Sequence, residues 1–202
     1  MDLSTAILSR RTVKRFTGAA LDRSQVEKLM VLACWAPNHR HSQPWRFRAC
    51  DQTAAKKLGL RLAGDSAFWT PIDAHKQSKT QELLSHAGAV LLVTWIRQSD
   101  ATKDREDHAA AAAAVQNLLL AATAAGLGSF WCTSLIFSHP RSLAQWGIDT
   151  SREGFLGAIF LGQSAEIPLP PPRLPLGERL FWLTMEEPPT GDPLPPPWPA
   201  SR

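Results

Sequence analysis

The uneven distribution of proline is the feature that most limits what this chain can fold into. Twelve of its 16 prolines lie in residues 168–202, and only four lie in residues 1–167. Because a proline ring fixes φ and removes a backbone N–H donor, a segment dense in proline cannot form helices or central strands. We therefore expect a folded domain over residues 1–167 and an extended, Pro-rich arm over residues 168–187. Residues 188–202 are expected to form a loose C-terminal tail.

The arm contains one apolar stretch, Leu180-Phe181-Trp182-Leu183. Removing such side chains from water is favourable. We therefore expect the arm to pack on the domain or on a partner subunit.

The composition is that of a globular protein, with 44% hydrophobic and 20% charged residues. A chain of this kind can bury a core, which excludes wholesale disorder. Cys34, Cys50 and Cys132 show no C-x-x-C spacing, and the six histidines show no metal-ligand spacing apart from His39-x-His41. We therefore expect neither a disulfide scaffold nor a metal site.

The first residues lack a positively charged region followed by an apolar run, and no stretch reaches 18 apolar residues. We expect no signal peptide and no membrane span, and the cysteine usage fits a reduced cytoplasm. The net charge of +4 favours anionic ligands without choosing between a nucleotide, a nucleic acid and an acidic lipid.

Hydrophobic periodicity predicts a domain in which helices and strands alternate. Helices are predicted over Asp2–Arg10, from Asp22 to before Pro37, around Ala54–Leu62, over Glu106–Ala125 and over Ser138–Gly147. Strands are predicted around Trp45–Cys50 and over Ala87–Ile96, Phe130–Ser134 and Phe155–Leu161. This order indicates an α+β fold with helices on both sides of one sheet.

The longest predicted helix is rich in alanine, since ten of residues 109–125 are Ala. Small side chains let a neighbouring helix approach closely. The helix is therefore either a central core helix or one that packs against its own copy in a dimer.

Two polar segments stand out, whereas motifs of the form G-x-G-x-x-G, G-x-x-x-x-G-K-[ST], G-x-S-x-G and H-E-x-x-H are absent from the sequence. The first segment, Arg10–Phe16, places four cations within six residues. It can bind phosphate through arginine forks, form a solvated helix end or contact nucleic acid. The second segment, Cys34–Phe47, is a Pro-bounded polar loop that serves either as a ligand-binding loop or as a structural corner.

Taken together, these segments resemble the nitroreductase-like flavoprotein family, and most closely its compact, single-domain bacterial branch of NAD(P)H nitroreductases. The resemblance rests on Arg-Arg-Thr-x-Lys-Arg-Phe, on an Ala-Pro-x-His loop ending in Gln-Pro-Trp-x-Phe, and on Gly126–Thr133 and Gly157–Gly162. It covers about residues 1–165. The sequence departs from the common pattern at His41, where many relatives have Asn, and at Trp131-Cys132-Thr133, which replaces the Pro-x-Gly of larger members.

The resemblance implies a mixed, mainly antiparallel central sheet flanked by helices, in an obligate homodimer with two FMN sites at the interface. By position, Arg10, Arg11 and Thr12 would hold the ribityl phosphate, and Lys14 would face the N1/O2 edge of the flavin. The other implied FMN contacts are Trp35 and His39, which reach the partner's flavin, the ring-lining Trp131, Cys132 and Thr133, and Arg173 at the phosphate. The implied NAD(P) contacts are Ala121, Ala122, Thr123, Ala124, Ala125 and Gly126.

The resemblance implies an FMN-dependent NAD(P)H oxidoreductase. Hydride would pass from NADH or NADPH to flavin N5 and on to a nitroaromatic, a quinone or an activated alkene, in a ping-pong scheme. Two alternatives stay open: a flavin-binding or flavin-modifying protein with little NAD(P)H oxidation, and a small basic nucleic-acid-binding protein. Cys132 has no neighbouring cysteine in the sequence, which indicates an inert thiol rather than a redox nucleophile.

Overall fold

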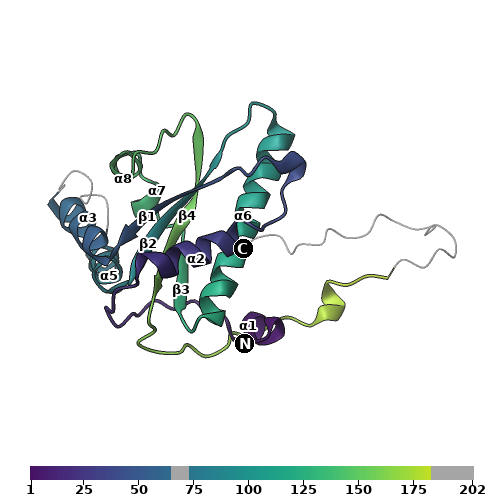
Figure 1. The fold of residues 1–202 in the computed structure, drawn as a ribbon, viewed down its shortest axis with the longest axis horizontal. Helices are drawn as coiled ribbons and strands as arrows, with labels where there is room; N and C mark the ends of the chain where they lie inside the picture. The colour runs from purple at the N-terminus through teal and green to yellow at the C-terminus, as the bar shows by residue number, and fades with distance from the viewer. Residues whose placement is uncertain (65–72, 183–202) are drawn as a thin grey trace. The chain divides into compact units, whose positions relative to one another are not determined.

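The computed structural model describes residues 1–64 and 73–182, and it divides into two units, Met1–Pro170 and Pro171–Arg202. The first unit is built on a four-stranded sheet with helices on both faces (Figure 1). The sheet has the strand order β1-β2-β4-β3, with bounds β1 Trp45–Asp51, β2 Ala89–Ile96, β3 Gly128–Cys132 and β4 Glu153–Gly162.

All neighbouring strands in this sheet are antiparallel, which confirms the predicted α+β class. The predicted central strand is also confirmed, because β2 lies between β1 and β4 and its residues from Ala89 to Thr94 are buried. A strand with neighbours on both sides and helices on both faces needs a continuous apolar run rather than an alternating one.

Alternation along the central strands divides the core into two layers. Leu91 and Ile159 face the layer that contains α2 (Arg23–Ala33) and α6 (Ala101–Ala124). Leu92 and Phe160 face the other layer. That layer is covered by α3 (Gln52–Gly64), α5 (Ala74–His86), α7 (Leu135–Ser138) and α8 (Pro140–Gln145) (Figure 1).

The alanine-rich helix α6 is a core helix whose Ala111, Ala114 and Ala122 are fully buried. Its predicted start at Glu106 is wrong by five residues. The Asp100 carboxylate accepts hydrogen bonds from the backbone N–H groups of Thr102 and Lys103 at 3.0 and 2.9 Å, so the cap starts the helix earlier. The helix ends where Gly126 adopts a φ of +74°.

Three further predictions needed correction. The helix predicted over Ser138–Gly147 forms as α8 with Pro140 at its first position, but its bounds are wrong, because His139 is extended before Pro140 and separates Ser138, which ends α7, from α8. The alternation of β1 fails at Ala49, which is exposed on this edge strand. Strand β3 begins two residues earlier than predicted and ends two residues earlier.

At the amino end, helix α1 spans Leu3–Ser9 and is capped by Asp2, whose carboxylate accepts a hydrogen bond from the N–H of Thr5 at 3.0 Å. In the second unit, one 3-10 turn, Leu176–Glu178, forms within the described residues 171–182. Leu183 of the predicted docking stretch and the whole predicted tail lie outside the described residues. The division of the chain into domain, arm and tail therefore stays a prediction. Across residues 1–64 and 73–182, none of the helices combines the length and apolar character needed to cross a membrane.

Candidate functional site

The N-terminal basic segment is an extended strand-like stretch along the outer edge of β3. Thr12 forms a parallel bridge with Ser129, and the N–H of Val13 donates a hydrogen bond to the Ser129 carbonyl at 2.9 Å. Val13 and Phe16 are buried in the sheet layer that α5 covers, whereas Thr12 and Lys14 are exposed. The alternation of an extended chain therefore turns Lys14 away from the core.

A cavity of about 580 Å³ lies between this segment, β3, α5 and α7. Its apolar lining includes Phe130 of β3, Leu83 of α5 and Ile136 of α7. Its polar lining includes Cys132 and Thr80. A pocket of this size that combines apolar surface with polar groups is typical of small-molecule and cofactor sites.

Lys14 is the cation placed most directly over the cavity lining. Its Nζ lies 5.3 Å from the centroid of the Phe130 ring, which is within cation–π range. This contact holds a positive charge beside an apolar surface, where an electrostatic interaction with a ligand is less screened than in open water.

Cys132 faces the same cavity as a neutral thiol. Burial raises the pKa of this thiol above its ordinary value, while the Ser134 N–H and the charge of Lys14 act in the opposite direction and do not overcome the burial. The N–H of Ser134 donates to Cys132 Sγ at 3.5 Å. A raised pKa leaves little thiolate at neutral pH, as expected of an inert thiol.

The other members of the predicted ring-lining segment lie differently. The Trp131 side chain faces the opposite layer, where its Nε1 donates to the Leu156 carbonyl at 3.2 Å and its indole covers Gly157. Thr133 follows the end of β3 and is exposed. Of these three side chains, the structure brings Cys132 together with Lys14.

The predicted phosphate-binding residues occupy the junction between α1 and the extended stretch. Arg11 Nη1 donates to the carbonyl oxygens of Leu8 and Arg10 at 2.7 and 2.8 Å, so its charge also satisfies the carboxyl end of α1. Arg10 is the residue at which the chain leaves the helix, with φ −55° and ψ 128°. Arg173 belongs to the second unit, where its Nη1 donates to the Pro172 carbonyl at 3.4 Å.

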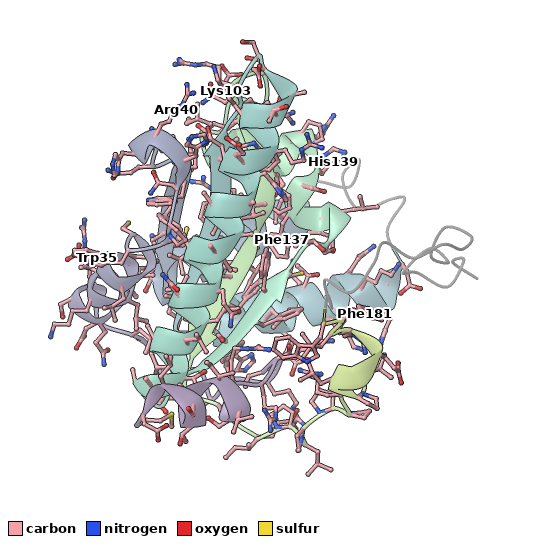
Figure 2. The ribbon with its side chains drawn as sticks, turned by 90° about the vertical axis from the view of Figure 1, so that its right-hand side faces the viewer. Trp35, Arg40, Lys103, Phe137, His139 and Phe181 are labelled. Carbon is pink, nitrogen blue, oxygen red and sulfur yellow. The ribbon has the colours of Figure 1, made fainter. Side chains whose placement is uncertain are left out.

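Trp35 and His39 lie on the loop between α2 and β1 and do not line the Lys14 cavity. Trp35 is 81% exposed and borders a separate, largely apolar cavity of about 720 Å³. Figure 2 shows it pointing away from the body of the domain. His39 Nδ1 lies 2.7 Å from a Glu106 carboxylate oxygen on α6.

This loop holds an unusual backbone. Arg40, His41 and Gln43 have φ values of +53°, +56° and +42°. These values lie in the left-handed region of the backbone, which residues other than Gly adopt uncommonly. Asn38 Oδ1 accepts a hydrogen bond from the N–H of Gln43 at 3.0 Å, and Ser42 Oγ donates to buried Asp107 at 2.6 Å. The strained backbone conformation is thus stabilised by the hydrogen bond within the loop and by the hydrogen bond from Ser42 to Asp107 on α6.

The predicted NAD(P)-binding turn coincides with the end of α6. Ala121–Ala124 complete the helix, Ala125 is its C-cap, and Gly126 makes the turn. The carboxyl end of a helix carries partial negative charge and repels phosphate. That assignment rests on the family resemblance alone.

The sequence reasoning missed a set of polar residues that the fold brings to the Lys14 cavity. These residues are Arg15, Lys76, Lys79, Thr80, Glu82, Ser134 and Glu166. Lys76 and Lys79 have a visible signal, because a spacing of three residues on a helix places both on one face. Within residues 1–64 and 73–182, no group of three or more His, Cys, Asp or Glu side chains is arranged to hold a metal ion.

Comparison with known proteins agrees with this architecture. The model of the nitroreductase family matches residues 7–163. The Bacillus subtilis protein named "Putative NAD(P)H nitroreductase YfhC" is 27% identical over 179 residues, which cover 88% of this chain and 92% of that protein.

Solved structures show the same fold. A nitroreductase-like protein from Bacillus cereus superposes with a TM-score of 0.77 at 24% identity, covering 91% of this chain and 96% of the other. A Desulfovibrio desulfuricans protein described as a "putative nitroreductase", solved in complex with FMN, gives a TM-score of 0.70 at 28% identity, covering 93% of this chain and 98% of the other. The extended basic segment, the sheet order and the family match over residues 7–163 lead to one conclusion: this chain belongs to the nitroreductase family.

Proposed function

We propose that this protein is an FMN-dependent NAD(P)H oxidoreductase that reduces a nitroaromatic, a quinone or an activated alkene. The observation that carries the proposal is the cavity in which Lys14 lies over Phe130 beside Cys132. The FMN complex of the Desulfovibrio relative and the name of the Bacillus subtilis relative support it.

The residues present fit FMN. A flavin ring has broad apolar faces and polar edges, and the cavity offers Phe130, Leu83 and Ile136 for the faces. Lys14 offers a charge for the N1/O2 edge. Arg10, Arg11 and Thr12 offer two guanidinium groups and a hydroxyl for the phosphate.

The extended backbone allows the arginines and Lys14 to bind different parts of one ligand. Arg10 and Lys14 are four residues apart, which spans roughly 13 Å at ~3.3 Å per residue. On a continuing helix, the two cations would lie together on one face. The bridge between Thr12 and Ser129 fixes the extended form, so the two charges can serve opposite ends of one ligand.

When bound, FMN would supply the hydride chemistry that connects NADH or NADPH with the second substrate. The chain supplies position and charge. Lys14 stabilises the negative charge that develops at N1/O2 upon reduction. Cys132, held as a neutral thiol in the cavity lining, would lie beside the ring without reacting, and solvent would supply the proton that the acceptor needs.

We further propose that two copies of the chain build each site. Trp35 is a large aromatic side chain exposed to 81%, and His39 lies on the same braced loop, so both can reach the flavin bound by a partner subunit. We expect a homodimer by light scattering at micromolar concentration. A monomer that still holds flavin would contradict this arrangement.

The experiment that tests the main proposal is anaerobic titration of the purified protein with NADH and with NADPH. A yellow protein whose flavin absorbance bleaches supports the oxidoreductase. A yellow protein that does not bleach would instead be a flavin-binding protein of the same fold. A colourless protein with salt-steep DNA binding would overturn both.

A further inference from the structure

The rim of the Lys14 cavity carries more positive charge than a bound flavin requires. Four cations line the cavity, namely Lys14, Arg15, Lys76 and Lys79. Two carboxylates, Glu82 and Glu166, line it as well and offset part of this positive charge. Arg15 and Glu166 pair at 3.3 Å and offset one another. Among the described lining residues, two positive charges remain in excess.

One of the cations left after that pair, Lys14, belongs to the segment assigned to FMN. The other two, Lys76 and Lys79, lie on α5 with Glu82, so α5 contributes one net positive charge to the rim. Lys76 and Lys79 are both exposed and share one face of the helix. The hydroxyl of Thr80, which is only 5% exposed, donates to the Lys76 carbonyl at 2.8 Å and ties this turn to the buried side of the helix. Lys76 also lies in the first turn of α5, where the Asp73 carboxylate accepts a hydrogen bond from its backbone N–H at 3.2 Å and caps the helix.

The charges of FMN are met elsewhere. Its phosphate is assigned to Arg10, Arg11 and Thr12, and the ring edge is assigned to Lys14, all on the N-terminal segment. The lysines of α5 are therefore available to bind an anionic group of a substrate. A lysine ammonium binds phosphate as a point charge and does not require a fixed orientation.

We propose that Lys76 and Lys79 select NADPH over NADH by attracting the additional 2′-phosphate of the hydride donor. This inference rests on the proposed function and deepens it. NADPH differs from NADH by one phosphate group, which carries about 1.5 to 2 negative charges at neutral pH. Two exposed lysines at the rim favour that group by roughly tenfold together, because exposed charge pairs are each worth only a few-fold.

The test compares the double variant Lys76→Gln/Lys79→Gln with the matched control Lys56→Gln/Lys57→Gln. Lys56 and Lys57 are exposed on the neighbouring helix α3, so the control removes the same charge away from the cavity lining. The NADPH-to-NADH ratio of kcat/KM is expected to be about ten for the natural protein and the control. It is expected to fall close to one in the Lys76/Lys79 variant, through a higher KM for NADPH.

A second measurement is independent of turnover. Calorimetry on the FMN-loaded protein compares 2′,5′-ADP with 5′-AMP, two fragments that differ by the same phosphate. We expect tighter binding of 2′,5′-ADP, and we expect this difference to be lost in the Lys76/Lys79 variant and to shrink as salt rises. If both fragments bind the natural protein equally, the inference is wrong.

Loss of FMN from the Lys76/Lys79 variant would also overturn the inference, because it would assign the lysines to the FMN phosphate. Flavin that neither donor bleaches would sink the proposed function itself. In that case, equal affinities for 2′,5′-ADP and 5′-AMP would also contradict the role of the lysines. Tighter binding of 2′,5′-ADP would show that the lysines select the 2′-phosphate of a nucleotide that does not donate hydride. Flavin that both donors bleach, with equal kcat/KM for NADPH and NADH in the natural protein, would sink only the inference.

Discussion

Lys14 Nζ lies 5.3 Å from the centroid of the Phe130 ring, and the backbone bridge between Thr12 and Ser129 lies two residues before Lys14 and one residue before Phe130. Phe130 lies one residue after Ser129 on β3, so the bridge sets the position of the lysine over the ring. The charge over the cavity is therefore placed by backbone pairing and does not depend on a flexible loop.

Replacing Lys14 tests whether this charge acts on the chemistry or on binding. Lys14→Met keeps the length of the side chain and removes the charge. We expect the flavin midpoint potential to fall by roughly 20–60 mV, because the negative charge formed on reduction loses its partner. Reduction by NAD(P)H should slow, and FMN occupancy should stay nearly the same. Lys28→Met, on the exposed face of α2, serves as the control. An unaltered potential together with lost FMN would reassign Lys14 to the phosphate.

The phosphate assignment is tested by comparing FMN with riboflavin. Arg10→Ala is expected to weaken FMN binding about 10- to 100-fold, since a charge-assisted hydrogen bond is worth roughly 1.5–3 kcal/mol, and to leave riboflavin binding nearly unchanged. Fluorescence titration with the two ligands measures both affinities. Arg23→Ala is a matched control, because Arg23 forms an exposed ion pair with Glu27 on α2. Equal losses for both flavins would mean that Arg10 acts on folding.

The ion pair between Arg48 and Glu153 predicts a pH dependence of stability. Arg48 donates two hydrogen bonds to the Glu153 carboxylate, at 2.7 and 2.8 Å, and the Thr94 hydroxyl donates a third. The hydrogen bonds from Arg48 lower the pKa of Glu153 below its ordinary value near 4.5. A lowered folded-state pKa gives stability that is present above the unfolded pKa and is lost as pH falls through the folded one.

We therefore expect Glu153→Gln to lower the free energy of unfolding by about 2 kcal/mol at pH 7. The difference from the natural protein should shrink as pH falls below about 4.5. Urea unfolding at a series of pH values measures it. Glu27→Gln, which breaks an exposed pair with Arg23, should change stability little. If the loss of unfolding free energy in Glu153→Gln stays constant down to acidic pH, the ionised pair between Arg48 and Glu153 is not the cause of that loss.

The contact between Trp131 and Gly157 predicts a size limit on β4. A Cβ on Gly157 would lie 2.2 Å from Trp131 Nε1, so Gly157→Ala should lower the free energy of unfolding by about 1–3 kcal/mol. Gly64→Ala is the control, because within residues 1–64 and 73–182 no atom lies within 4 Å of a Cβ at that position. Adding Trp131→Ala should recover part of the loss in urea unfolding. A double variant no better than the sum of the two single variants would place the strain elsewhere.

Local chemistry determined several elements from the sequence alone. The capping pair of Asp22 and Gln25 starts α2 as predicted, with the Asp22 N–H donating to Gln25 Oε1 at 3.0 Å. Pro37 limits that helix, Gly126 ends α6, and the apolar run of β2 forms a central strand. Each of these signals acts over a few residues, which is why a sequence shows it.

The candidate site depends on contacts that no local pattern contains. Alternation along β3 predicts that Trp131 and Cys132 face opposite sides, but only the order of the strands and the bridge between Thr12 and Ser129 decide that the cavity lies on the side of Cys132. Lys76 and Lys79 reach that cavity because α5 packs over the same layer, and Glu166 reaches it because the chain after β4 returns beside Arg15. The sequence by itself determined the local elements, and through the family resemblance it predicted which residues bind a phosphate and a flavin edge. Packing between segments far apart in the chain decided which side chains share one cavity, because burial of the two core layers fixes the face on which each element presents its polar residues.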